Sequence, residues 1–246
     1  MGMASVTASR PVAMALSPLL ARQARRVRQR TPRLAEASGD STGIELTADA
    51  TDLLRLLVVG ESTAAGVGVT DLRDALPCQL AVALAARRQC NVAWSMSART
   101  GATASFAAQK LAPVAPMGQD IAVLMVGVND ALKFTSRQTW RTDIDQLINE
   151  LEKHVRPGGQ VVLAGLPDLG RFGTFPQPLR AVLGWQARAL DRDLETIARR
   201  SASVIYLAMP PVSSPKLFAE DRFHPNAAAY QVLAAYFADT LATTKP

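Results

Sequence analysis

Residues 54–69 read LRLLVVGESTAAGVGV, a hydrophobic run of strand length that stops at Gly60. An acidic residue, two hydroxyl residues and several small residues follow, so the strand ends in a tight turn around Ser62. Turns at the carboxyl end of a strand serve three chemistries: phosphate binding, dinucleotide binding and catalysis by a serine nucleophile. The rest of the chain has to distinguish between them.

Strand and helix patterns alternate five times from this stretch onward. Further strand patterns cover residues 91–98, 120–130, 160–167 and 203–209, and helix patterns cover 71–88, 101–113, 136–155, 178–200 and 226–242. Alternation of this kind predicts an α/β protein in which a mainly parallel, doubly wound sheet of about five strands lies between helical layers. Functional residues of such sheets gather at the carboxyl ends of the strands.

The positive charge of the chain is concentrated at its beginning. The formal net charge is +6, yet residues 1–34 contain seven arginines and no acidic residue. The remainder carries one more acidic than basic residue and is nearly neutral. We therefore expect no nucleic-acid partner, and we divide the chain into a basic N-terminal arm (1–40) and a folded domain (41–246).

The arm does not resemble a cleaved export signal, because arginines follow its apolar stretch 11–21 where small residues would be needed. Leu16, Leu20, Ala24 and Val27 could form a weak apolar stripe on a basic helix, which would either pack on the domain or touch a membrane surface. We expect the arm to be dispensable for chemistry. Cys78 and Cys90 form no disulfide framework, and we expect a cytoplasmic protein.

Two of the three turn chemistries fit poorly. A phosphate-binding loop needs four residues between its glycines and then a lysine, but Gly60 and Gly66 have five residues between them and Val67 follows. The run from Gly66 lacks the third glycine of a dinucleotide fingerprint. A flavodoxin-like loop, in which the Ser62 and Thr63 hydroxyls hold a flavin phosphate, stays open as an alternative.

A serine nucleophile needs a base, and the chain has two histidines. His224 follows the fifth strand pattern and directly precedes the last helix pattern, and Asp221 lies three residues before it. In a loop this spacing lets the carboxylate reach the imidazole Nδ1 and leaves Nε2 for a hydroxyl group. His154, near the end of a helix pattern, is explained by the helix dipole.

Donors for an oxyanion can be found at the same sheet edge. The strand pattern 120–130 ends in Gly127-Val128-Asn129-Asp130, and the side-chain amide of Asn129 can donate, although an asparagine there can also be a simple turn former. Gly101 follows the second strand and could offer an N–H where a side chain would obstruct the substrate. The N–H of Ser62 would be the third donor.

These four blocks resemble those of the SGNH hydrolases, the GDSL esterases and lipases, in order and spacing from about residue 54 to 240. The blocks are 60–62, Gly101, 127–130 and 221–225. The resemblance implies a flavodoxin-like, three-layer α/β/α sandwich with Ser62 as nucleophile, His224 as base and Asp221 as its orienting acid. It assigns the oxyanion hole to Ser62, Gly101 and Asn129. Glu61 replaces the usual aspartate, and since that residue mainly shapes the turn we expect tolerance.

The expected activity is hydrolysis of carboxylic esters of short to medium acyl chain through an acyl-enzyme, without metal or cofactor. Lysophospholipase, thioesterase and sugar O-acetylesterase activities are alternatives within the same fold. Two loops approach the site, and four of their apolar side chains could line an acyl pocket or anchor the loops: Phe172, Phe175, Leu217 and Phe218.

Overall fold

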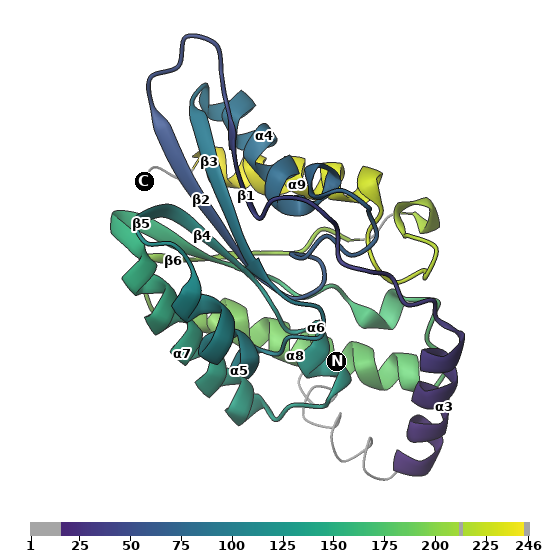
Figure 1. The fold of residues 1–246 in the computed structure, drawn as a ribbon. Coiled ribbons are helices and arrows are strands. Elements are labelled where there is room, and N and C mark those ends of the chain that lie inside the picture. The colour runs from purple at the N-terminus through teal and green to yellow at the C-terminus, as the bar shows by residue number, and fades with distance from the viewer. Residues whose placement is uncertain (1–15, 212–213, 244–246) are drawn as a thin grey trace.

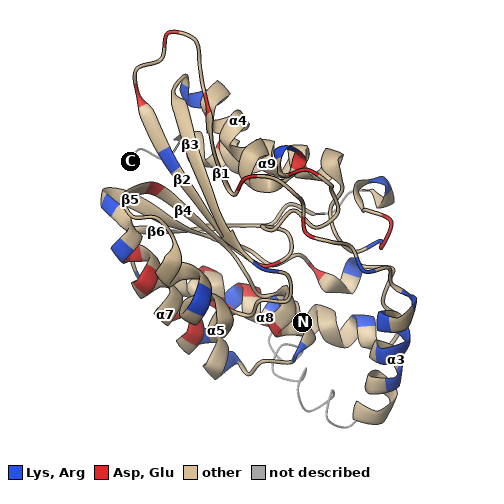
Figure 2. Cartoon of the chain, in the orientation of Figure 1, with Lys and Arg blue, Asp and Glu red and all other residues tan. Residues whose placement is uncertain are grey.

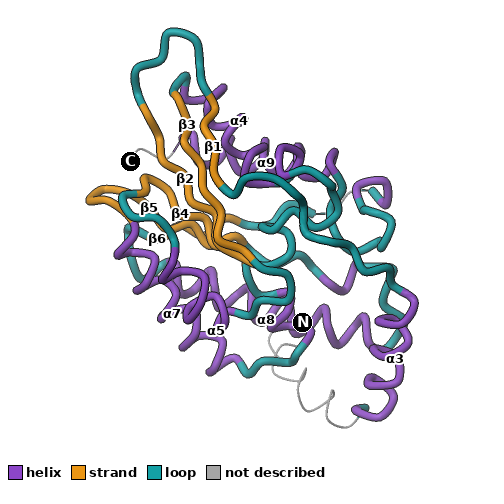
Figure 3. Tube along the Cα trace, in the orientation of Figure 1, coloured by secondary structure: helices purple, strands orange, loops and turns teal. Residues whose placement is uncertain are grey.

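A single six-stranded sheet forms the centre of the molecule (Figures 1 and 3). The computed structural model describes residues 16–211 and 214–243. The strands are β1 (Thr42–Glu45), β2 (Leu53–Gly60), β3 (Asn91–Ala98), β4 (Gln119–Met125), β5 (Val155–Ala164) and β6 (Val204–Leu207), in the spatial order β1-β3-β2-β4-β5-β6. Five strands are parallel, as predicted, and the short edge strand β1 runs antiparallel to β3.

Helices cover both faces of the sheet, which confirms the three-layer α/β/α sandwich (Figure 1). The helices α4 (Leu76–Arg88) and α9 (Ala227–Thr243) lie on one face, and α5 (Ala104–Phe106), α7 (Arg137–His154) and α8 (Leu179–Ala198) lie on the other. Along β2, Leu56 and Val58 contact the first layer while Leu57 and Val59 contact the second. Burial on both faces explains why the strand is continuously hydrophobic from Leu56 to Val59 instead of alternating.

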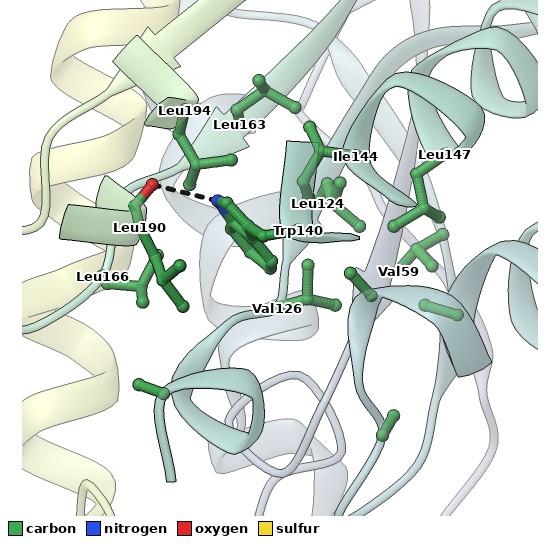
Figure 4. Close-up of a cluster of buried hydrophobic side chains, with 14 of the residues drawn as sticks. Val59, Leu124, Val126, Trp140, Ile144, Leu147, Leu163, Leu166, Leu190 and Leu194 are labelled. Carbon is green, nitrogen blue, oxygen red and sulfur yellow. Dashed lines mark hydrogen bonds between the residues drawn. The ribbon is translucent and has the colours of Figure 1, made fainter. Parts of the chain in front are cut away.

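Trp140 of α7 is the largest side chain in the core beneath α7 and α8 (Figure 4). Its indole N–H donates a hydrogen bond to the carbonyl oxygen of Leu190 at 3.1 Å, so the one polar atom of the ring is satisfied while the ring is fully buried. Leucine and valine side chains from β2, β4 and β5 surround it. This packing holds α7 and α8 firmly against the sheet.

Among the predicted strands, two differ most in their bounds from the observed ones. The strand expected over 120–130 ends at Met125, and Val128–Leu132 forms the short helix α6. The cause is Gly127, whose φ of +124° turns the chain out of the strand direction. The strand expected from residue 160 begins earlier, at Val155.

The N-terminal segment forms the helix α3 (Ser17–Arg30), which packs on the domain. Leu20 is buried in the core beneath α8, and Leu16 and Val27 pack against the same core. Gln23 donates to the carbonyl oxygen of Gln177 and accepts from the N–H of Leu179. The predicted stripe therefore serves contacts within the chain. No helix among the described residues is long and apolar enough to cross a membrane.

Candidate active site

Ser62 lies in the turn that follows β2, at the carboxyl edge of the sheet. The turn is closed by hydrogen bonds from the N–H of Ala65 to the Glu61 carbonyl and from the N–H of Val67 to the Ser62 carbonyl. Gly60 is required just before it, because a Cβ there would collide with the carbonyl oxygen of Met125. The turn thus presents Ser62, which is only 9% exposed, from a close-packed strand end.

The structure brings Ser62, His224 and Asp221 together in one chain of hydrogen bonds. The His224 Nε2 lies 3.0 Å from the Ser62 Oγ, and the His224 Nδ1 lies 2.5 Å from Asp221 Oδ2. Although burial acts to raise the pKa of Asp221, hydrogen bonds from His224 and Phe223 hold it below its ordinary value. The ionised Asp221 can only accept, so Nδ1 carries the proton and Nε2 is free to accept the Ser62 hydroxyl proton.

A tight loop curls Asp221 back onto the imidazole. Asp221 Oδ1 accepts the N–H groups of Phe223 and His224, and Arg222, which follows Asp221, takes a left-handed backbone with φ of +55°. After the loop, Asn226 Oδ1 accepts the N–H of Ala229, which confirms the predicted cap of the last helix. The placement of Asp221 against His224 therefore follows from local turn chemistry.

Gly101 and Asn129 line one cavity beside this chain of hydrogen bonds. Gly101 has φ of +80° in the turn closed by the bond from Ala102 N–H to the Arg99 carbonyl, a position that favours glycine. A Cβ on Gly101 would meet no protein atom within 4 Å and would stand in open space. Within the part of the chain that the structure describes, no acceptor is assigned to the N–H of Ser62 or Gly101, so both can serve an incoming oxygen.

Glu61 does more than shape the turn. Its carboxylate accepts the N–H of Val128 at 2.9 Å, the N–H of Asn129 at 3.0 Å and the side-chain amide of Asn129. Burial raises the pKa of Glu61 to about 7 against the lowering effect of these bonds. The expectation that Glu61 mainly shapes the turn is wrong, because the carboxylate fixes the orientation of Asn129 and leaves the second amide hydrogen for another acceptor.

Two cavities lie at this site, and the predicted acyl-pocket residues divide between them. The smaller cavity, about 150 Å³, is lined by Ser62 and His224 and also by Phe172, Leu217 and Phe218. The larger, about 830 Å³, is lined by Gly101, Asn129 and Phe175. Phe223, the residue before His224, lines both cavities.

The two histidines have different environments. His154 is buried at the far end of α7, where the chain enters β5, and its nearest acidic group is Glu150 at 3.7 Å. It therefore lies at the opposite edge of the sheet from Ser62. Among residues 16–211 and 214–243, no group of three histidine, cysteine or acidic side chains could hold a metal ion.

Comparison with known proteins identifies the family. The family model of the GDSL-like lipases and acylhydrolases matches residues 58–232, which include every block of the site. The chain belongs to this family. A GDSL-like esterase of Mycobacterium tuberculosis is 30% identical over 193 residues, a match that covers 74% of this chain and 59% of that relative's length.

Solved structures of other proteins share the fold. A psychrotrophic esterase from Pseudoalteromonas sp. superposes with a TM-score of 0.58 at 14% identity, covering 76% of this chain and 96% of that chain. A carbohydrate acetylesterase family member from Sinorhizobium meliloti gives a TM-score of 0.56 at 19% identity, covering 76% and 97%. At these identities the likeness shows the fold alone.

Proposed function

We propose that the protein is a serine esterase that hydrolyses carboxylic esters of short to medium acyl chain through an acyl-enzyme. The observation that carries the proposal is the hydrogen-bonded series Ser62 Oγ, His224 Nε2, His224 Nδ1, Asp221 Oδ2. Family membership and the cavity that Ser62 and His224 line support it. No metal or cofactor takes part in the proposed steps.

In the proposed mechanism, Ser62 Oγ attacks the ester carbonyl carbon while His224 Nε2 takes its proton. The N–H groups of Ser62 and Gly101 and the Asn129 amide donate to the oxyanion that forms. His224 then protonates the leaving alcohol, and the acyl group stays on Ser62. Water, deprotonated by the same imidazole, releases the acid and restores the enzyme.

The substrate is open within this chemistry. Lysophospholipase, thioesterase and sugar O-acetylesterase activities would use the same residues. A flavin-binding module, an alternative outside enzymology, predicts a yellow protein with a flavin absorption band, whereas the esterase proposal expects no such band.

A panel of p-nitrophenyl esters from acetate to palmitate tests the proposal. We expect release of p-nitrophenol, fastest with short and medium acyl chains, and the same rate after treatment with EDTA. Enzyme treated with a fluorophosphonate is the blank. A folded protein that hydrolyses no member of the panel faster than this blank would refute the esterase proposal.

Glu61 gives a prediction about stability and pH. Its pKa rises from 4.5 to about 7 on folding, so between these values the unfolded chain has lost a proton that the folded protein keeps. Stability therefore falls as the pH rises through this window, and the Glu61→Gln variant lacks that loss. Between pH ~4.5 and ~8, we expect the wild type to lose about 3 kcal/mol more of its free energy of unfolding than Glu61→Gln does.

Urea unfolding of both proteins at the two pH values measures this difference, since the other titrating groups are common to both. We also expect Glu61→Gln to have a lower kcat than the wild type at the higher pH. There the wild-type carboxylate is ionised, and the neutral amide of glutamine accepts hydrogen bonds from the two N–H groups and the Asn129 amide less well than a carboxylate does. A pH-independent difference in stability would show that Glu61 ionises as an exposed carboxyl group does.

A further inference from the structure

The larger cavity is walled on one side by α3, a helix outside the region that the family model matches. Residues 17–33 contribute apolar groups, Leu20, Ala24 and Val27, and two cations, Arg28 and Arg33. Gly101 and Asn129 line the same cavity. The N-terminal segment thus reaches the immediate surroundings of the proposed oxyanion donors, which argues against the expectation that it is dispensable.

The position of α3 is fixed by specific contacts. Besides the bonds of Gln23 to Gln177 and Leu179, the segment after the helix binds the domain at several points. Glu36 accepts the N–H of Thr100, the residue before Gly101, and the N–H of Ala37 donates to the carbonyl oxygen of Ala65. These bonds tie the wall to the two turns that carry Gly101 and Ser62.

The charged side chains described as lining the larger cavity are all basic. Arg28, Arg33 and Lys133 line it, and its described lining includes no acidic residue. Among the described residues, neither arginine forms an ion pair within 4 Å, and α3 itself contains no acidic residue (Figure 2). Behind Lys133, Asp130 already accepts the N–H of Ala104 and the hydroxyl of Thr135. The two arginines are therefore available to an anion.

The direction of the substrate follows from the proposed chemistry. The leaving oxygen must face His224, which lines the smaller cavity, so the alcohol part of the ester occupies that cavity. The acyl chain then passes the oxyanion donors into the larger one, whose volume of about 830 Å³ suits a medium-length chain. The anion that the arginines bind is accordingly at the far end of the acyl group.

We propose that α3 completes the acyl-binding pocket and that Arg28 and Arg33 select acyl groups ending in an anionic group such as a carboxylate. The proposal rests on the esterase function proposed above. It moves the acyl site from the loops of Phe172, Leu217 and Phe218 to the cavity of Phe175. It also gives a role to the positive charge of the N-terminal segment, since the remainder of the chain is nearly neutral.

Two substrates of equal chain length test the selection: p-nitrophenyl hydrogen suberate, whose acyl group ends in a carboxylate, and p-nitrophenyl octanoate, whose acyl group ends in a methyl group. We expect the wild type to prefer the suberate in kcat/KM. The suberate-to-octanoate ratio of kcat/KM should fall about tenfold in the double variant Arg28→Gln/Arg33→Gln. A fall of this size corresponds to the loss of one charge-assisted interaction. The double variant Arg25→Gln/Arg26→Gln removes equal charge from exposed positions of α3 that do not line the cavity, and should keep the ratio.

An equal fall of the ratio in both double variants at about 0.15 M salt would overturn the proposal, because it would show a general attraction by the basic helix. Absence of any preference in the wild type would overturn it as well. A bulky side chain tests the wall itself: Ala24→Trp should lower the octanoate-to-acetate ratio about tenfold, whereas Arg26→Trp, of equal bulk outside the cavity, should not.

Calorimetry separates this proposal from the esterase proposal. Suberic acid monoamide carries the carboxylate and an unreactive amide in place of the ester, so its binding needs no turnover. We expect the wild type to bind it more tightly than octanamide, and the Arg28→Gln/Arg33→Gln variant to lose that difference. If no ester is hydrolysed but this difference is found, the esterase function fails and the anion-selective pocket stands; equal binding of the two amides by the wild type overturns the pocket.

Discussion

Replacing His224 by alanine is expected to lower kcat on p-nitrophenyl esters by about 10⁴- to 10⁶-fold, because Ser62 then has no base and the leaving alcohol has no acid. The imidazole Nε2 stands 3.0 Å from the Ser62 Oγ and Nδ1 contacts Asp221, so the substitution removes the group that is placed to exchange a proton with Ser62. Steady-state kinetics at saturating ester measure the effect.

The other histidine is the matched control. His154→Gln changes a buried imidazole at the opposite edge of the sheet, and we expect kcat within a few-fold of the wild type for protein that melts cooperatively. Comparable losses of kcat in both variants would mean that the effect of His224→Ala is structural, and would contradict the assignment of His224 as the base.

The second large effect is expected at Asn129. Asn129→Ala should lower kcat by about 10²- to 10³-fold and change KM little, since the oxyanion exists only in the transition state. Asn129→Asp should be as harmful or worse. The new carboxylate would lie beside the forming oxyanion and also beside Glu61, whose carboxylate accepts two hydrogen bonds from Asn129.

Thermal melts of each variant separate catalysis from folding. If Asn129 served only as a turn former, aspartate would be the gentler change, because both residues suit turns. Asn149→Ala, on the exposed face of α7, provides the control for removal of an asparagine amide. A folded Asn129→Ala enzyme with near-normal kcat would exclude the oxyanion role.

The parts of the fold that could be predicted from sequence are those fixed by local pattern. The buried strand over 54–59 and the turn at Ser62 follow from a hydrophobic run that ends in Gly60. Asp221 and His224 could be paired because a separation of three residues lets one loop join them. The edge strand β1 was not predicted, since its four residues are only partly buried and show no strand-length hydrophobic run.

The parts that could not be predicted depend on contacts between distant segments. Glu61 contacts Val128 and Asn129 across 67 and 68 residues, and nothing in the local sequence distinguishes this from a turn-shaping role. The division of Phe172 and Phe175 between two cavities depends on where Phe223 lies, in another loop. The docking of α3 required knowing that Gln23 meets the start of α8.

The central claim is that Ser62 is the nucleophile, and covalent labelling measures this directly. A fluorophosphonate should inactivate the enzyme with a stoichiometry of about one adduct per chain, because the reagent phosphonylates an activated serine hydroxyl. Peptide mass spectrometry should place the adduct on Ser62, and the folded His224→Ala variant should label far more slowly. An adduct on any other residue, in enzyme that has lost its activity in proportion to labelling, would contradict the account.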